Sequence, residues 1–217
     1  MKVRPPNPPL FGLVLAGGFS RRMGRDKGLM PIGPLPAREH FRHLLLTGCD
    51  QVWLSLRPEQ CASIPPNAAI RPHVLPDLFP GEGPLGALYS AFAFRPDADW
   101  FVLPCDLPNM HAALIQELCA AWRVCQQGAE ETEAHPNQAL LLQPEPGQSQ
   151  APHALLCRHP DRPYPEPLVG IWSGKASEII EQMFNKGERA VFRILPKLRV
   201  QEFIPKDLTT LQNNNDQ

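Results

Sequence analysis

The chain has 217 residues, of which 43% are hydrophobic. This length suits one domain, or one domain with an insertion, and it is sufficient to bury a substantial core. The 21 basic and 22 acidic side chains give a formal net charge of −1, which creates no long-range field for nucleic acid or an anionic membrane. An anionic ligand must therefore be held by a local cluster of residues.

The first nine residues are rich in proline, and we expect them to form a flexible tail. A continuous apolar run follows at residues 11–16 and ends in Gly17-Gly18. Runs of this kind are typical of a strand buried on both faces of a parallel sheet. The run is too short for a signal peptide and lacks a small-residue cleavage site. No other apolar stretch approaches the ~18 residues that span a bilayer.

Hydrophobic spacing then predicts helices and strands in alternation. Helices are expected at 38–46, from 83 through 92, at 111–126, near 175–185 and at 188–195. Strands are expected at 51–56, 73–75, 100–103, 154–157, 168–172 and 200–204. This alternation predicts an α/β fold with a mostly parallel sheet. In such sheets ligands bind beyond the carboxyl ends of the strands.

Residues 127–150 do not follow this pattern. They are rich in Glu, Gln, Pro and Gly around a short apolar run at 139–142, which is typical of a flexible insertion. We therefore expect a single domain over residues 10–217 that carries this insertion. The six cysteines include no C-x-x-C pair, and without a secretory signal they indicate reduced thiols in a cytoplasmic protein.

The loop after the first predicted strand is the most informative segment. Residues 15–27 read LAGGFSRRMGRDK. Glycines let the backbone approach a ligand and turn its N–H groups inward, and Arg21, Arg22, Arg25 and Lys27 can neutralise a polyanion. The spacing is neither G-x-G-x-x-G nor a Walker A loop. The loop suits a triphosphate; the alternative is a glycine-rich turn with a solvated basic surface.

A carboxylate follows another predicted strand. Asp106 stands directly after the strand at 100–103, in the sequence PCDLP. An aspartate at this place can hold Mg²⁺ against phosphate oxygens, although it can also cap a turn. Its neighbour Cys105 has no identifiable histidine partner, so we expect a small buried thiol and not a nucleophile. Because both segments follow strands, we expect Gly17–Lys27 and Cys105–Pro108 to meet at one edge of the sheet.

These two segments resemble the MobA-like nucleotidyltransferase family. The family pattern L-A-G-G-x-S-x-R-M-G-x-D-K matches residues 15–27 at every fixed position, and its C-D-x-P element matches 105–108. Residues 76–77, 83–88, 165–172 and 213–215 are similar to further family elements. The likeness is closest to molybdenum cofactor guanylyltransferases. The chain departs from the family at Ser55, where Asn is frequent, and at residues 33–37.

The resemblance implies a Rossmann-like, three-layer nucleotidyltransferase fold. It also implies Mg²⁺-dependent transfer of GMP from GTP to the phosphate of molybdopterin, with release of pyrophosphate. GTP and a molybdopterin-type acceptor are the implied partners, and apo-enzymes that accept the finished cofactor are further candidates. The implied nucleotide contacts are Leu15, Ala16, Gly17, Gly18, Lys27, Ser55, Asp77 and Asp106.

The chemistry of the transfer assigns roles to a smaller set of residues. We expect Arg21, Arg22, Lys27 and Asp106 to act in catalysis, by electrostatic stabilisation and alignment. Asp106 is the expected Mg²⁺ ligand, and the resemblance implies that Asn215 or Asn213 completes its shell. Two alternatives remain open: a nucleotidyltransferase with another acceptor or with CTP, and a degenerate nucleotide-binding module with a regulatory role.

Overall fold

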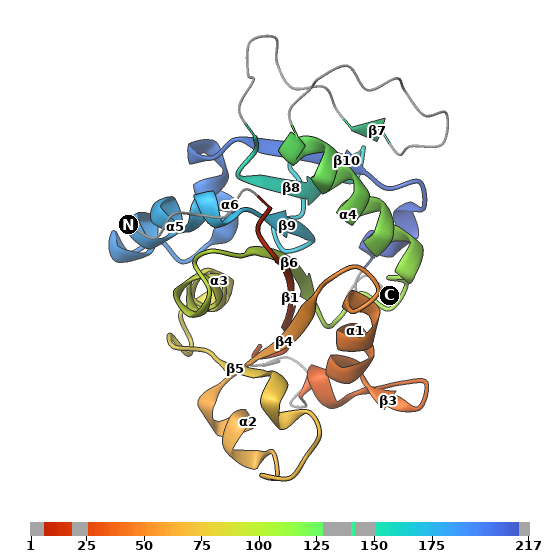
Figure 1. The fold of residues 1–217 in the computed structure, drawn as a ribbon, viewed down its shortest axis with the longest axis vertical. Helices are drawn as coiled ribbons and strands as arrows, with labels where there is room; N and C mark the ends of the chain where they lie inside the picture. Colours follow the sequence, from red (N-terminus) through yellow and green to blue (C-terminus); the bar gives the residue numbers. More distant parts are fainter. Residues whose placement is uncertain (1–6, 19–25, 128–139, 142–150, 213–217) are drawn as a thin grey trace.

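Figure 1 shows the computed structural model of the chain, in which helices cover both faces of one central sheet. The structure describes residues 7–18, 26–127, 140–141 and 151–212. The sheet has eight strands in the order β5-β4-β1-β6-β9-β8-β10-β7. Its strands are β1 (Leu10–Leu15), β4 (Gln51–Leu56), β5 (Val74–Pro76), β6 (Asp99–Pro104), β7 (Leu140–Leu141), β8 (Ala154–Cys157), β9 (Gly170–Trp172) and β10 (Val200–Ile204).

Strand direction divides the sheet into two parts. β5, β4, β1 and β6 are all parallel to one another, and β8 is parallel to β10. β9 is antiparallel to both of its neighbours, and β7 is antiparallel to β10. The four adjacent parallel strands therefore bring their carboxyl ends to one edge of the sheet.

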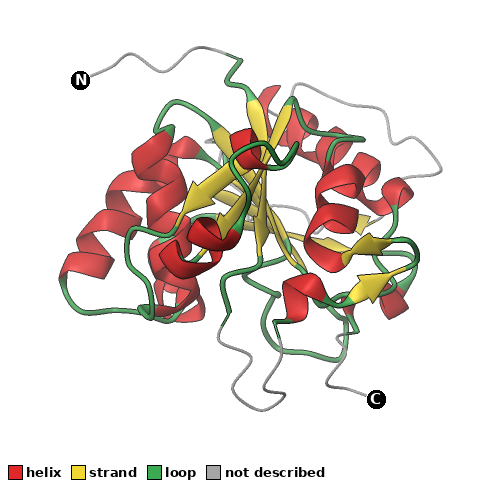
Figure 2. Cartoon of the chain, turned by 90° about the horizontal axis from the view of Figure 1, so that it is seen from below, coloured by secondary structure: helices red, strands yellow, loops and turns green. Residues whose placement is uncertain are grey.

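Helices form the two outer layers, as the view along the sheet shows (Figure 2). The helices α1 and α4 cover one face, and α3, α5 and α6 cover the other (Figure 1). Their bounds, together with the short α2 beside β5, are α1 (Ala37–Leu45), α2 (Pro58–Ser63), α3 (Gly83–Phe94), α4 (Ala112–Gln127), α5 (Ser177–Asn185) and α6 (Val191–Ile194). A small hairpin of β2 (Pro31–Ile32) and β3 (Leu35–Pro36) precedes α1.

The apolar runs in the sequence reflect two hydrophobic cores, one on each face of the sheet. Alternate side chains of a strand point to opposite faces. In β6, for example, Phe101 and Leu103 join the core under α1 and α4, whereas Trp100 and Val102 join the core under α3 and α5. All four are completely buried, and fully burying a side chain of this size stabilises the fold by about 1.5–3 kcal/mol.

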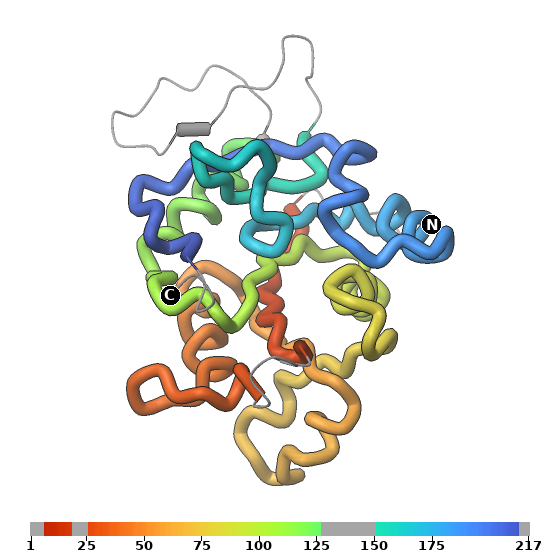
Figure 3. Tube along the Cα trace, turned by 180° about the vertical axis from the view of Figure 1, so that it is seen from behind, coloured from red at the N-terminus to blue at the C-terminus, as the bar shows by residue number. Residues whose placement is uncertain are grey.

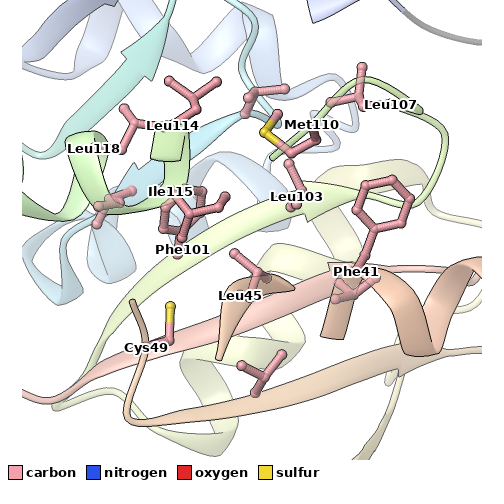
Figure 4. Close-up of a cluster of buried hydrophobic side chains, with 14 of the residues drawn as sticks. Phe41, Leu45, Cys49, Phe101, Leu103, Leu107, Met110, Leu114, Ile115 and Leu118 are labelled. Carbon is pink, nitrogen blue, oxygen red and sulfur yellow. The ribbon is translucent and has the colours of Figure 1, made fainter. Parts of the chain in front are cut away.

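Figure 4 shows the core beneath α1 and α4. Phe41 and Leu45 stand one helical turn apart on α1, and Leu114 and Leu118 do the same on α4. Both helices turn these residues toward Phe101 and the neighbouring side chains of the sheet (Figure 4). This packing fixes the position of the sheet edge at which the parallel strands end.

The predicted α/β fold with a mostly parallel sheet is confirmed, and each expected strand and helix is present within a few residues. The sequence did not predict α2, the β2–β3 hairpin or the antiparallel direction of β9, which begins at Gly170 and not at 168.

Within the expected insertion, Leu140–Leu141 form β7, and most of the remainder lies outside the described residues. Of the expected tail, Pro9 already accepts a hydrogen bond from the backbone N–H of Asp99. No helix in the described part of the chain is long and apolar enough to cross a membrane.

Candidate functional site

A cavity of about 420 Å³ opens at the carboxyl ends of the parallel strands. Its volume is within the range of small-molecule binding sites. It is lined by the ends of β1, β4 and β6, the turn after β5 and the start of α3. The structure places around it all eight residues expected to contact the nucleotide, namely Leu15, Ala16, Gly17, Gly18, Lys27, Ser55, Asp77 and Asp106.

One wall of the cavity is the backbone that leaves β1. The guanidinium of Arg57 lies behind this wall and donates hydrogen bonds to the carbonyl oxygens of Gly17 and Gly18, at 2.7 and 2.9 Å. β4 pairs with β1 in parallel, so the chain that follows β4 lies beside the end of β1 (Figure 3). In a trans peptide the C=O and the N–H point in opposite directions. Because Arg57 holds the Gly17 carbonyl, the N–H of Gly18 is turned away from Arg57.

Lys27 and Asp106 form an ion pair at the cavity, with 3.2 Å between Nζ and Oδ2. Asp106 follows β6 and Lys27 begins a short 3-10 turn that packs beside α1, so the pair connects segments 79 residues apart. Their side chains are only 20% and 24% exposed. The prediction that the segments Gly17–Lys27 and Cys105–Pro108 meet at the sheet edge is confirmed by this pair. Lys27 therefore faces the cavity and is not part of a solvated basic surface.

Cys105 is adjacent to this ion pair but is not equipped as a nucleophile. Its side chain is buried, as the sequence predicted. Burial, followed by the negative charges of Asp106 and Asp26, raises the pKa of the Cys105 thiol to about 12. A nucleophilic cysteine needs a lowered pKa so that the thiolate is present near neutral pH. The thiol thus stays protonated and serves as packing beneath Asp106.

Asp77 stands on the opposite wall, in the turn between β5 and α3. Its Oδ1 accepts hydrogen bonds from the backbone N–H of Phe79 at 2.9 Å and from the Ser90 hydroxyl at 3.2 Å. Within the described residues, both hydrogen bonds of this carboxylate go to Oδ1, so Oδ2 is available to a ligand in the cavity. The side chain of Ser90 itself is buried on α3.

The start of α3 completes this wall. Gly83, Pro84 and Ala87 line the cavity. Gly83 has a φ of +74°, and an added Cβ would lie 3.3 Å from the carbonyl oxygen of Arg189. This left-handed conformation favours glycine, and it lets the chain turn from Asp77 into the helix. Pro84 then occupies a first-turn position, where its missing N–H leaves no helical hydrogen bond unmade.

Several expected site residues lie outside the described part of the chain. These are Arg21, Arg22, Arg25, Asn213 and Asn215. The last described turn, Leu208–Leu211, is held near Asp106 because the Asn109 side chain donates a hydrogen bond to the Thr209 carbonyl at 3.2 Å. The sequence did not single out Arg57 or Gln60, whose only signal is a polar pair three residues apart directly after a buried strand.

Comparisons with known proteins agree with this architecture. The sequence pattern of the MobA-like NTP transferase domain matches residues 12–201. A molybdenum cofactor biosynthesis bifunctional protein of Synechocystis is 28% identical over 207 residues, which cover 95% of this chain and 51% of that protein. The chain therefore spans about half the length of that relative. A probable molybdenum cofactor guanylyltransferase of Synechococcus elongatus is 30% identical, over 94% of this chain and 92% of that protein.

Solved structures share the fold at lower sequence identity. Molybdopterin-guanine dinucleotide biosynthesis protein A of Archaeoglobus fulgidus superposes with a TM-score of 0.67 at 19% identity, covering 94% of this chain and 92% of that one. A Mycobacterium tuberculosis protein, whose structure was determined in complex with manganese, gives a TM-score of 0.54 at 17% identity, covering 91% and 88%.

Proposed function

The chain belongs to the MobA-like NTP transferase family and is a nucleotidyltransferase, and we propose that it transfers GMP from GTP to the phosphate of a molybdopterin acceptor, with release of pyrophosphate. The observation that carries the proposal is the Lys27–Asp106 ion pair in a cavity also lined by Gly17, Gly18 and Asp77. The cavity thereby combines a cation, a carboxylate and backbone amides, which are the groups needed to hold a triphosphate and a divalent cation.

Asp77 is the proposed contact to the guanine base. Guanine carries hydrogen-bond donors on N1 and N2, and a carboxylate is an acceptor. Oδ1 of Asp77 is already held by Phe79 and Ser90, so Oδ2 can accept from the base while the side chain stays fixed. Adenine presents an acceptor at N1, so this contact would favour GTP over ATP.

The opposite wall is the proposed place of the phosphates. The N–H of Gly18 is turned away from Arg57, and Lys27 lies within the same cavity. Amides and a cation together neutralise and orient a triphosphate. Arg21 and Arg22 follow in the same loop, and we assign them to the departing pyrophosphate on the chemistry of the sequence alone.

A divalent cation fits beside Asp106. Mg²⁺ is usually bound by one or two carboxylates together with substrate phosphates and water, so a single carboxylate facing the phosphate site is an adequate protein ligand. Within the described residues no group of three or more His, Cys, Asp or Glu side chains forms a metal cage. Asn215, if it joins the shell, comes from outside the described residues. When bound, the cation would supply charge neutralisation at the phosphates.

The reaction requires alignment more than acid–base chemistry. The acceptor phosphate is already ionised near neutral pH, so it needs no strong general base in order to attack the α-phosphate. The difficulty is to bring two anions together, and preorganised positive charge reduces that barrier. Lys27, held in place by Asp106, supplies such a charge without a covalent intermediate.

Thermal unfolding with GTP, ATP, CTP or UTP, each with and without Mg²⁺, tests the nucleotide. A ligand at a hundred times its dissociation constant stabilises the folded state by about 2.7 kcal/mol, which for this size corresponds to a rise in Tm of roughly 5–10 °C. We expect this rise with GTP and Mg²⁺, followed by GMP transfer to molybdopterin in a direct assay. A preference for CTP or UTP would instead indicate a different transferase. Absence of any shift would favour the degenerate nucleotide-binding module.

A further inference from the structure

One buried side chain contacts both Ala16 and Asp26, the residues that flank the glycine-rich segment. Gln60, on the short helix α2, is only 7% exposed. Its amide Nε2 donates to the carbonyl oxygen of Ala16 at 3.2 Å, where the loop begins, and to Oδ2 of Asp26 at 2.6 Å, where it ends. These partners are 44 and 34 residues away in the sequence.

The chemistry of this position requires an amide. Oε1 of Gln60 accepts the backbone N–H of Arg57 at 3.0 Å, which caps α2. One end of the side chain must therefore accept, and the other must donate to a carbonyl oxygen and to a carboxylate. Of the ordinary polar side chains with this length, only glutamine offers an acceptor and two donors on the same planar group. A glutamate would instead direct a second carboxylate at Asp26.

Asp26 connects Gln60 to the turn that begins at Lys27. Its other oxygen, Oδ1, accepts the backbone N–H of Gly28 at 2.9 Å and caps the 3-10 turn that begins at Lys27. Gly28 also packs closely against Ala16, because a Cβ added at Gly28 would lie 3.2 Å from the Cβ of Ala16. The position of the Lys27 backbone is thus set by the link between Gln60 and Asp26.

We propose that Gln60 is a positioning residue for triphosphate binding. By tying Ala16 to Asp26 it places Lys27 opposite Asp106 and holds the start of the glycine loop against the cavity. This inference rests on the proposed function, in which Lys27 and the glycine amides receive the phosphates. It goes beyond that function because Gln60 itself does not line the cavity. Its effect should therefore fall on the phosphates and leave the base contact at Asp77 intact.

Calorimetric binding to three ligands tests the proposal. We would titrate GTP, inorganic triphosphate and GMP, each with Mg²⁺, into the wild-type protein and into Gln60→Met and Gln60→Glu. Methionine keeps the size of the side chain without its hydrogen bonds, and glutamate keeps the shape but reverses the donor. We expect affinity for GTP and for triphosphate to fall at least tenfold, with affinity for GMP changed less than twofold.

Arg71→Met is the matched control. Arg71 holds the other end of α2, through hydrogen bonds to the carbonyl oxygens of Cys61 and Ile64 at 2.8 and 2.6 Å, and it is not among the described residues that line the cavity. Because Arg71 is bonded to α2 from the side away from Gln60, this variant should lower the midpoint of urea unfolding and leave affinity for all three ligands unchanged. If loosening α2 by this route weakened triphosphate binding as much as Gln60→Met does, the role of Gln60 would be structural only and the proposal wrong.

A second pair of variants tests the hydrogen bond between Gln60 and Asp26 by changing Asp26. Asp26→Asn should weaken triphosphate binding in the same direction, and it serves in place of Gln60→Met if that variant does not fold. In the double variant Asp26→Asn with Gln60→Glu, the asparagine amide can donate to the new carboxylate, so triphosphate affinity should recover at least threefold relative to Gln60→Glu. No recovery, or equal losses for GMP and triphosphate in the single variants, would overturn the inference alone. Wild-type protein that binds neither GTP nor triphosphate would overturn the proposed function and this inference with it.

Discussion

The two sides of the cavity are held in place by different kinds of contact. On the loop side, Gly17, Gly18 and Lys27 depend on hydrogen bonds and an ion pair to residues between 39 and 79 positions away. On the α3 side, Asp77 is fixed by residues 2 and 13 positions away. The loop side therefore depends on contacts among segments that follow β1, β4 and β6. On the α3 side the carboxylate of Asp77 is held within one strand–turn–helix unit, although its backbone N–H donates to the Leu56 carbonyl of β4 at 2.8 Å.

This difference suggests how each side responds to substitution. A change at Arg57 or Gln60 can move groups 34 or more positions away, because the hydrogen bonds of these two side chains hold those groups. A change on the α3 side should stay confined to Asp77 and its immediate partners. If the proposed function holds, phosphate binding and base recognition can be altered separately, and the predictions below test that separation.

The largest effect is expected on the loop side, at Asp106. Asp106→Ala removes the proposed cation ligand and the partner of Lys27, so the rate of GMP transfer at limiting Mg²⁺ should fall on the order of a hundredfold or more, about 3 kcal/mol. Steady-state kinetics with varied Mg²⁺ measure this, with Asp161→Ala, on an exposed loop, as the control. Full activity of Asp106→Ala at limiting Mg²⁺ would remove the assignment of this carboxylate.

Asp77→Asn probes the α3 side. Hydrogen bonds to a charged group contribute about 1.5–3 kcal/mol, so the affinity for GTP should fall by roughly tenfold to a hundredfold. Affinity for inorganic triphosphate should stay at the wild-type value, which is the reverse of the pattern expected for Gln60→Met. Calorimetric titration of both ligands into both variants makes the comparison direct. A parallel loss of triphosphate binding in Asp77→Asn would show that the two sides are not independent.

The pH dependence of stability tests whether the Cys105 thiol is shielded from solvent. Its folded-state pKa is raised to about 12 from an ordinary value of 9.0, so the folded state holds the proton more tightly than the unfolded state. The associated stability is complete below pH 9 and is lost as the pH rises toward 12. At pH 10 wild-type protein should lose about 1 kcal/mol relative to Cys105→Ala, measured by urea unfolding at pH 7.5 and pH 10. Equal losses in the two proteins would contradict the enclosed environment of this thiol.

The smallest effect is expected at Ser90. Ser90→Ala removes a hydroxyl that accepts the backbone N–H of Leu78 at 3.0 Å and whose single proton is shared between Oδ1 of Asp77 at 3.2 Å and the Gly86 carbonyl at 2.8 Å. Losing a hydrogen bond of this kind costs about 1 kcal/mol of stability, because the buried partners are left without it. Urea unfolding should show this loss together with a slight decrease in GTP affinity. A decrease in triphosphate affinity as well would argue against purely local support on this side.

The sequence predicted the strands of the central sheet well because both of their faces are buried. β1, β4 and β6 appear as continuous apolar runs, and their order in the chain with intervening helices indicates a parallel arrangement. The direction of β9 could not be predicted in this way, since side-chain alternation is the same in parallel and antiparallel strands. The six residues of α2 and the two-residue strands of the β2–β3 hairpin are too short to show a periodic pattern.

For the site, the sequence identified the residues that carry charge or glycine character at strand ends. The segments Gly17–Lys27 and Cys105–Pro108 were expected to meet because parallel strands end at one edge, and the ion pair between Lys27 and Asp106 confirms it. Arg57 and Gln60 were not predicted as site residues, because a polar residue after a strand is usually expected to lie on the surface. Only the folded chain shows that Gln60 is buried and that its partners are the two ends of the glycine loop.

By itself, then, the sequence determined which segments become strands and helices and which edge of the sheet carries the reactive groups. Both follow from local hydrophobic periodicity and from the geometry of parallel strands. The tertiary structure alone decided how the loop after β1 is held, because hydrogen bonds between residues 34 and 44 positions apart leave no periodic signal in the chain. They depend on the packing of β4 against β1, which brings α2 beside the loop.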